Sequence, residues 1–166
     1  MDPELIAAAA RVLEANRAAG RTIVTAESCT GGLVAAALTE IAGASDVFER
    51  GFVTYSNEAK MEATGVNIDI LETFGAVSVA VAWAMAQGAL KHSRADVAVA
   101  VTGIAGPGGG SERKPVGTVV FACAVRDGDP ATIIADTRQF GDLGRAEIRR
   151  QAALVALDLL MPETKA

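Results

Sequence analysis

The chain has 166 residues, 51% of them hydrophobic, and a formal net charge of −5. This length fits a single domain over residues 1–166, and no apolar run approaches the ~20 residues that span a bilayer. The acidic balance argues against broad nucleic-acid binding, which needs a positive surface. The first residues, Met1-Asp2-Pro3-Glu4, lack the basic region of a signal peptide, so we expect a cytoplasmic protein without a membrane partner.

Cysteine and histidine usage argues against disulfide and zinc chemistry. A core of this size needs no disulfide, and we expect Cys29 and Cys123 to be reduced. With the single histidine, His92, they provide too few ligands for a zinc site of ordinary spacing. We therefore expect no bound metal, and no other cofactor.

The first half of the chain alternates predicted helices and strands. Asp2 suits the N-cap of a helix that begins at Pro3 and stops at Gly20. The next predicted elements are a strand at Thr22–Thr25, a buried helix at Leu33–Ile41, a strand within Val47–Tyr55, and a short helix capped by Asn57 that carries Lys60. A glycine-rich turn joins the first strand to its helix, and such a unit places a side chain at the carboxyl edge of a sheet.

The second half predicts a mixed sheet. A helix from Ser78 to about Leu90 precedes Asp96–Val101, which is apolar on both faces, as central strands covered by helices are. Gly117–Val125 and Ala131–Phe140 flank a turn and predict an antiparallel hairpin, and Arg145–Leu160 predicts a final helix. The order of elements indicates an α/β fold, a single-domain three-layer α/β/α sandwich with a mixed β-sheet.

Ser28 lies where the first predicted strand gives way to a helix. This position exposes its hydroxyl as a candidate nucleophile, and the backbone N–H groups of Thr30, Gly31 and Gly32 could receive an oxyanion. The ordinary alternative is that Ser28 or Thr30 only caps the helix. Cys29 is a rival nucleophile because a thiol at a helix start can have a lowered pKa, although cysteine is also a common core residue. Spacing alone leaves these alternatives open.

A serine nucleophile needs a base, and serine–lysine pairs are an established variant of the catalytic triad. Lys60 can act only when neutral, which a place in the first turn of a helix favours. Tyr55, the only tyrosine, could relay or donate a proton. His92 is a poor candidate because its polar surroundings indicate a surface position. The alternatives are a solvated lysine paired with Glu58 or Glu62, and a packed tyrosine with one hydrogen bond.

A glycine-rich loop, Gly103–Gly110, follows the predicted central strand at Thr102. It could cradle a phosphate or simply be flexible, since it lacks the ending of a P-loop and a complete dinucleotide fingerprint. Its place is the better indication, because ligands gather at the carboxyl ends of strands in α/β sheets. We therefore take Thr102 and Gly103 as candidate substrate contacts. Arg145, Arg149 and Arg150 could bind a phosphate or form a solvated face.

Four blocks in this order resemble the CinA C-terminal domain, the family of the PncC nicotinamide-nucleotide amidases. They are Thr25–Gly32, Phe48–Lys60, Gly75–Ser78, and Thr102–Pro107 continuing to Lys114–Val119. The resemblance runs from about Ala7 to Leu160, nearly the whole chain. Four blocks in the right order are far more specific than any one of them alone.

The resemblance implies hydrolysis of nicotinamide mononucleotide to nicotinate mononucleotide and ammonia, a step of pyridine nucleotide salvage. It implies Ser28 as the nucleophile of an acyl-enzyme, with Lys60 and Tyr55 in support. Arg145 is the candidate for the substrate phosphate. Because the chain begins at the amidase, it resembles the stand-alone form, and the resemblance also implies a homo-oligomer.

One departure from the family concerns this phosphate. An arginine commonly follows a Gly-Asp pair directly before the last helix, whereas here Gly141-Asp142 is followed by Leu143-Gly144 and only then by Arg145. The insertion places Arg145 two residues further from this pair than the family's arginine, so the sequence does not decide between Arg145 and its neighbours Arg149 and Arg150.

Two other classes of function stay open. The chain could be a serine amidase for another small carboxamide, which a panel of substrates would separate. It could also be a non-catalytic nucleotide-binding module. The presence of Ser28, Tyr55 and Lys60 together counts against that reading, since a retired site has no reason to keep all three.

Overall fold

The computed structural model describes residues 1–163, which form one five-stranded sheet of order β2-β1-β3-β4-β5. The strands are β1 (Ile23–Glu27), β2 (Phe48–Val53), β3 (Val97–Gly103), β4 (Thr118–Val125) and β5 (Ile134–Gln139). β1 runs parallel to β2 and to β3, whereas β3–β4 and β4–β5 are antiparallel. The predicted mixed sheet and its hairpin are confirmed.

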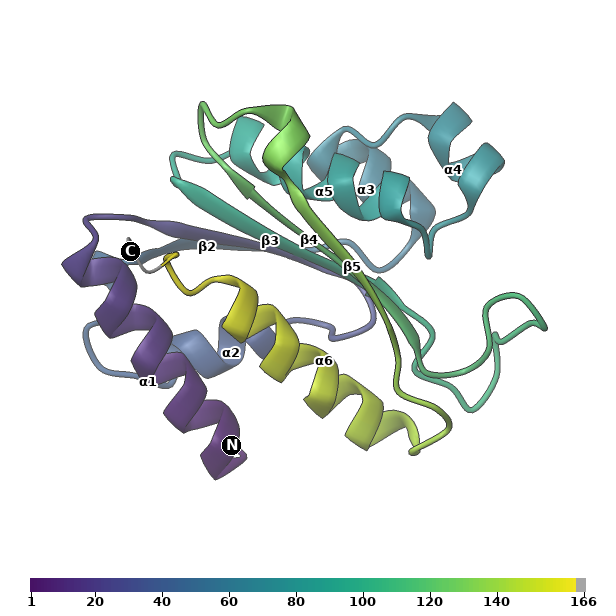
Figure 1. Ribbon diagram of the computed structural model, residues 1–166, viewed down its shortest axis with the longest axis horizontal. Coiled ribbons are helices and arrows are strands. Elements are labelled where there is room, and N and C mark those ends of the chain that lie inside the picture. Colours follow the sequence, from purple (N-terminus) through teal and green to yellow (C-terminus); the bar gives the residue numbers. More distant parts are fainter. Residues whose placement is uncertain (164–166) are drawn as a thin grey trace.

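Helices cover both faces of this sheet (Figure 1). One layer contains α1 (Pro3–Ala18), α2 (Leu33–Thr39) and α6 (Arg145–Leu159), and the other contains α3 (Asn57–Thr64), α4 (Ile68–Phe74) and α5 (Val79–Lys91). Each face buries its own apolar cluster, so the core lies between each helical layer and the sheet. The three-layer α/β/α sandwich is confirmed. Within residues 1–163, no helix combines the length and apolarity needed to cross a membrane.

The cap of α3 differs from the expectation. Ser56 is the N-cap, and its hydroxyl accepts a hydrogen bond from the Ala59 N–H at 3.0 Å. Asn57 is instead the first helical residue, so the expected Asn57 cap is wrong. Serine and asparagine are both favoured caps, and extended backbone at Ser56 decides between them. Lys60 thus lies one residue further into the helix than expected.

Helix α4 and a 3₁₀ turn before β5 were not expected from the pattern. Helix α4 has seven residues and begins after Asn67, whose side chain accepts from the Asp69 N–H at 2.8 Å. Strand β5 begins at Ile134 and not at Ala131, because a short 3₁₀ turn (Pro130–Thr132) comes before it. Helix α4, with seven residues, and the 3₁₀ turn, with three, are shorter than the windows in which helical periodicity is recognised.

The register of the three parallel strands brings their carboxyl ends to one edge. Glu27 at the end of β1 pairs with Val53 of β2 and with Val101 of β3. The next residues at this edge are Ser28, Thr54 and Thr102. Side chains from three separate parts of the sequence therefore meet where ligands gather in α/β sheets.

Helix α3 lies very close to α5 at Gly88. A Cβ added at Gly88 would lie 1.7 Å from the carbonyl oxygen of Thr64, the last residue of α3. The Thr64 hydroxyl donates to the carbonyl oxygen of Lys60 at 2.7 Å, which links this contact to the residue that enters the pocket. The absence of a side chain at Gly88 therefore sets how deeply α3 packs.

We expect Gly88→Ala to lower the free energy of unfolding by about 1–3 kcal/mol, since overpacking forces the backbone apart. Chemical denaturation measures this. The control is Gln87→Ala on the same helix, which should change the value by less than about 0.5 kcal/mol. A Gly88→Ala protein as stable as the wild type would contradict the close approach of the two helices.

Candidate active site

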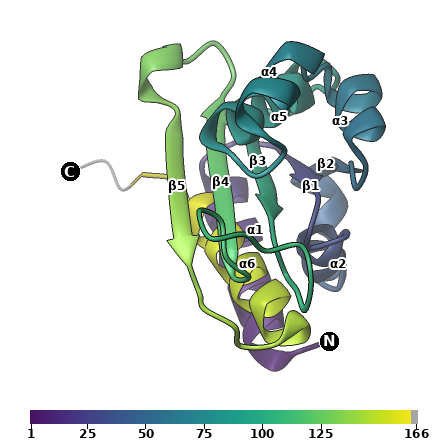
Figure 2. The same ribbon diagram turned by 90° about the vertical axis from the view of Figure 1, so that its right-hand side faces the viewer.

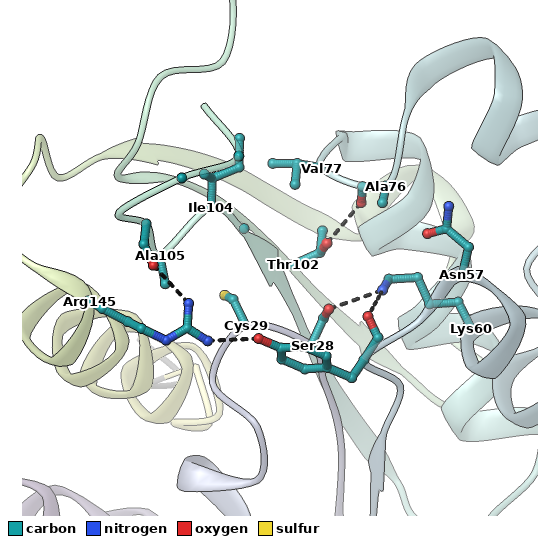
Figure 3. Close-up of a pocket in the computed structure, with 15 residues that line it drawn as sticks. Ser28, Cys29, Asn57, Lys60, Ala76, Val77, Thr102, Ile104, Ala105 and Arg145 are labelled. Carbon is teal, nitrogen blue, oxygen red and sulfur yellow. Dashed lines mark hydrogen bonds between the residues drawn. The ribbon is translucent and has the colours of Figure 1, made fainter. Parts of the chain in front are cut away.

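A pocket of about 270 Å³ opens at the carboxyl edge of β1, β2 and β3 (Figure 3). Of the residues predicted from sequence, those that line it are Ser28, Tyr55, Lys60, Thr102, Gly103 and Arg145. Three predicted oxyanion residues, Thr30, Gly31 and Gly32, are not among its lining residues. The pocket thus gathers most of the predicted site from four regions of the sequence.

Ser28 and Lys60 are in contact within the pocket. The Lys60 Nζ lies 3.0 Å from the Ser28 Oγ, 2.9 Å from the carbonyl oxygen of Thr54 and 3.3 Å from that of Tyr55. Lys60 is only 2% exposed, so the alternative of a solvated surface lysine is wrong. Burial removes water from the ammonium and holds the pKa of Lys60 below its ordinary value of 10.5.

The three oxygens around the Lys60 Nζ can accept all three hydrogens of an ammonium, and they also fit a neutral amine. Such an amine has two hydrogens and one lone pair, whereas an ammonium has three hydrogens and no acceptor. The carbonyl oxygens of Thr54 and Tyr55 can accept the two hydrogens. The lone pair then remains for the Ser28 hydroxyl, which can donate its proton across 3.0 Å. The arrangement can therefore activate serine as a nucleophile.

A buried carboxylate organises the turn that carries Ser28. Glu27 is fully buried, and its oxygens accept from the backbone N–H groups of Val34 at 2.9 Å and Ala35 at 3.0 Å. A carboxylate is favoured there by the positive end of the α2 dipole. The Gly31 N–H donates to the carbonyl oxygen of Ser28 at 2.9 Å. The Gly31 N–H is therefore used within the protein, which disfavours it as an oxyanion donor.

Glu27 was not among the residues singled out from sequence. The available signal was an acidic residue at the end of an apolar strand, directly before a glycine turn. Because a buried charge must be hydrogen-bonded, such a residue indicates a nearby cluster of backbone donors.

The three arginines of the last helix have different partners. Arg149 donates to the carbonyl oxygens of Cys29 at 3.1 Å and Thr30 at 2.9 Å, and so holds the turn beside Ser28. Arg150 binds carboxylates at the start of α1. Of these arginines, Arg145 alone lines the pocket. The cluster seen in the sequence is therefore not one phosphate site.

Arg145 lies in the pocket lining (Figure 3) and contacts the hydroxyl of Tyr55. Its Nη2 donates to the Tyr55 hydroxyl at 2.7 Å, and its Nη1 donates to the carbonyl oxygen of Gly106 at 2.8 Å. Tyr55 is 58% exposed, so the alternative of a packed tyrosine is wrong. Tyr55 reaches Lys60 through its backbone carbonyl, while its phenol contacts Arg145.

Cys29 lies in the pocket lining but is poorly suited to nucleophilic attack. It is buried, and desolvation raises the pKa of its thiol to about 11. The thiol therefore stays protonated near neutral pH, whereas the thiolate is the nucleophile. Cys29 and Cys123 are both free, as predicted. His92 is exposed at the end of α5, also as predicted. In residues 1–163, no three His, Cys, Asp or Glu side chains gather as a metal site.

Comparison with known proteins accounts for nearly the whole chain. Residues 6–164 match the family model described as the CinA C-terminal domain. The chain belongs to this family. The resemblance seen in the four sequence blocks is thereby confirmed, and the pocket lies within the matched CinA C-terminal domain.

Relatives in the CinA family include proteins of similar length and much longer ones. The nicotinamide-nucleotide amidohydrolase PncC of Escherichia coli strain K12 is 53% identical over 159 residues, 96% of this chain and 94% of that protein. A CinA-like protein of Mycobacterium avium strain 104 is 55% identical over 89% of this chain, which spans 34% of that protein. The crystal structure of the competence/damage inducible protein CihA from Agrobacterium tumefaciens has a TM-score of 0.92 and 51% identity, and the match covers 96% of this chain and 95% of that one.

Proposed function

We propose that this chain hydrolyses nicotinamide mononucleotide to nicotinate mononucleotide and ammonia. The observation that carries the proposal is the buried Ser28–Lys60 pair, 3.0 Å apart, in a pocket of about 270 Å³. A supporting finding is the 53% identity to a nicotinamide-nucleotide amidohydrolase over nearly its full length. The chain is thus an amidase that acts on the carboxamide of a small nucleotide.

Acylation begins with neutral Lys60. The Ser28 Oγ attacks the carboxamide carbon, and its proton moves to the Lys60 Nζ at 3.0 Å. A new C–O bond forms, and the carbonyl electrons move to the oxygen. When the C–N bond breaks, the Lys60 ammonium gives its proton to the leaving nitrogen, which departs as ammonia. Lys60 is then neutral again beside a Ser28 ester.

Deacylation repeats the same proton transfers with water. Lys60 takes a proton from the water that attacks the ester carbon, and returns it to the Ser28 Oγ as the ester bond breaks. The product leaves as the carboxylic acid of nicotinate mononucleotide, which then gives its proton to the solvent and becomes the carboxylate. Lys60 accepts and returns one proton in acylation and one in deacylation, and water is the only co-substrate.

The developing oxyanion needs donors that face the pocket. The Gly31 N–H is already bonded to the carbonyl oxygen of Ser28. We propose in its place the N–H groups of Cys29 and Ala105, since both residues line the pocket. The N–H of the residue after a nucleophile is a common oxyanion donor where a strand turns sharply into a helix.

Arg145 is placed to receive the substrate phosphate. Two of its five N–H hydrogens are used by Tyr55 and Gly106, which leaves three for an anion. The glycine-rich loop forms the adjacent wall through Gly106, Gly108 and Gly109, where backbone can approach a phosphate closely.

We expect Arg145→Met to raise the KM for nicotinamide mononucleotide about tenfold or more, with a smaller change in kcat, because a charge-assisted contact to phosphate is lost. Steady-state kinetics measure both constants. Nicotinamide riboside, which lacks the phosphate, is the matched substrate and should show little change in KM. An equal loss on both substrates would contradict a phosphate contact.

Tyr55→Phe should keep kcat within a few-fold of wild type, since the phenol contacts Arg145 and not Lys60.

The first test is ammonia release from nicotinamide mononucleotide by the purified protein after chelation of metals. Nicotinate mononucleotide must appear in equal amount. Nicotinamide, nicotinamide riboside and glutamine form the comparison panel. Faster hydrolysis of another member would assign the chain to a different carboxamide, and no hydrolysis by folded protein would leave the non-catalytic binding module.

We further propose that the substrate is the only small-molecule partner and that copies of the chain assemble with one another. The net charge of −5 supports the exclusion of nucleic acid as a partner. Free Cys29 and Cys123 suit the reducing conditions of the cytoplasm, where a nucleotide salvage enzyme meets its substrate.

A further inference from the structure

Strand β5 forms an exposed edge of the sheet (Figure 2). Five of its six residues are exposed, and Asp136 is half-buried. Its neighbour in the sheet is β4, and no strand in residues 1–163 pairs with its other side. The outer edge of β5 therefore presents backbone hydrogen-bonding groups to the surroundings.

The direction of these groups follows from the register with β4. The Phe140 N–H donates to the carbonyl oxygen of Gly117 at 2.9 Å, so this residue faces β4. Backbone groups alternate along an antiparallel strand, and β5 has no register shift against β4. The outward-facing residues are therefore Ala135, Thr137 and Gln139.

The only charged residues of this edge strand are Asp136 and Arg138, whose charges are opposite. β5 contains no proline and no lysine, and its pairing with β4 is regular. The opposite edge differs, because β2 pairs with β1 through a register shift between Ile23 and Val24. Arg50 of β2 also donates to the carbonyl oxygen of His92. Of the two edges of the sheet, β5 is therefore better suited than β2 to pair with another strand.

We propose that β5 pairs antiparallel with β5 of a second copy of this chain, about a two-fold axis at Thr137. This register lets the outward groups of Thr137 bond to those of the other Thr137, and Ala135 to Gln139. It also places Asp136 of each copy opposite Arg138 of the other. These are non-hydrogen-bonded pairs, in which the side chains of an antiparallel ladder come closest. Ile134 then lies opposite Phe140.

The charges of β5 are complementary to those of a second β5, which favours a second copy of this chain as the partner. In the single chain, Arg138 Nε and Asp136 Oδ2 already form an ion pair at 2.5 Å within the strand. In the pairing about Thr137, Asp136 of each copy faces Arg138 of the other copy. Each of these charges therefore has a partner of opposite sign. The contact is isologous and occupies the outer edge of β5 in both copies. It therefore forms a closed dimer and does not continue as a fibre.

An apolar surface beside the edge adds to the contact. Ile134 is 44% exposed and pairs with Cys123, which belongs to the cluster on the α6 side of the sheet. A cavity of about 880 Å³ lies there, between the start of β5 and the end of α6, with Ile134 and Leu159 in its lining. The register brings Phe140 of the second copy to Ile134, at the border of this cavity.

Charge reversal tests the register. Sedimentation equilibrium should give about twice the chain mass of 16.9 kDa for the wild type. Asp136→Arg and Arg138→Asp should each raise the dimer dissociation constant about tenfold or more, because like charges then face each other twice. The double variant should return to the wild-type constant. Circular dichroism of each variant separates loss of pairing from loss of folding.

A cysteine at the axis provides a second measurement. Thr137→Cys should form a disulfide-linked dimer on mild oxidation, since Cα atoms in a hydrogen-bonded antiparallel pair lie about 5.5 Å apart. Gln139→Cys is the control, because its two copies would lie more than about 13 Å apart. Cys29 and Cys123 are buried and should not contribute. A monomeric wild type would overturn the proposal, and so would a dimer unaffected by either reversal and not linked through position 137.

Discussion

Replacing Ser28 by alanine should lower kcat/KM for nicotinamide mononucleotide by about a thousandfold or more while the fold stays intact. Removal of a nucleophile has effects of this order. The remaining thiol cannot substitute, because burial raises the pKa of Cys29 to about 11. Alanine is smaller than serine and enters the same buried space without strain. Ammonia release measures the activity, and thermal unfolding checks the fold.

The matched control is Cys29→Ala, the neighbour of Ser28 in the same pocket. It should keep activity within about tenfold of wild type, since the thiol takes no part in the proton transfers. Rapid acid quench and mass spectrometry should find a nicotinate mononucleotide ester on the peptide that contains Ser28. An inactive Cys29→Ala protein beside an active Ser28→Ala protein would transfer the role of nucleophile to Cys29.

Most of the fold could be predicted because its elements have strong patterns. The run of β3 is apolar on both faces, and it lies at the centre of the sheet as such strands do. Helix α4 could not be predicted, since its seven residues depend on the Asn67 cap and on packing against α5. Local spacing carries no information about such a tertiary contact.

Local spacing predicts the tertiary contacts of the site even less well than those of the fold. Spacing alone leaves open a solvated Lys60, whereas in the structure Lys60 is buried on α3, which packs closely against α5 at Gly88. Arg149 reaches the carbonyl oxygen of Cys29 across 120 positions in the sequence, and no short motif predicts that contact. The family resemblance identified Ser28 and Lys60, whereas their distance and the two carbonyl oxygens beside the Lys60 Nζ came only from the structure.

Replacing Lys60 by methionine should lower kcat by about 10²–10⁴-fold, the usual contribution of a general base. Wild-type activity should rise with pH through the lowered pKa of Lys60, as the amine loses its proton. The control is Lys60→Arg, which keeps a cation of similar length but cannot act as a base. It should be as inactive as Lys60→Met across the pH range. Substantial activity in either variant would contradict the proton transfers assigned to Lys60.

The same lysine should leave a signature in stability. The pKa of Lys60 is lowered in the folded chain and returns to about 10.5 on unfolding, so between these values the unfolded chain binds more protons. The free energy of unfolding of the wild type should therefore rise with pH, relative to that of Lys60→Met, from the lowered pKa up to 10.5. Below this pH window, burial of the Lys60 ammonium lowers the free energy of unfolding of the wild type by its full amount. Above the window, Lys60 is neutral in both states and this effect disappears. Urea denaturation of both proteins at a series of pH values measures the difference. A difference that does not change with pH would mean that Lys60 keeps an ordinary pKa, and a lysine that is charged at neutral pH could not take the proton from Ser28.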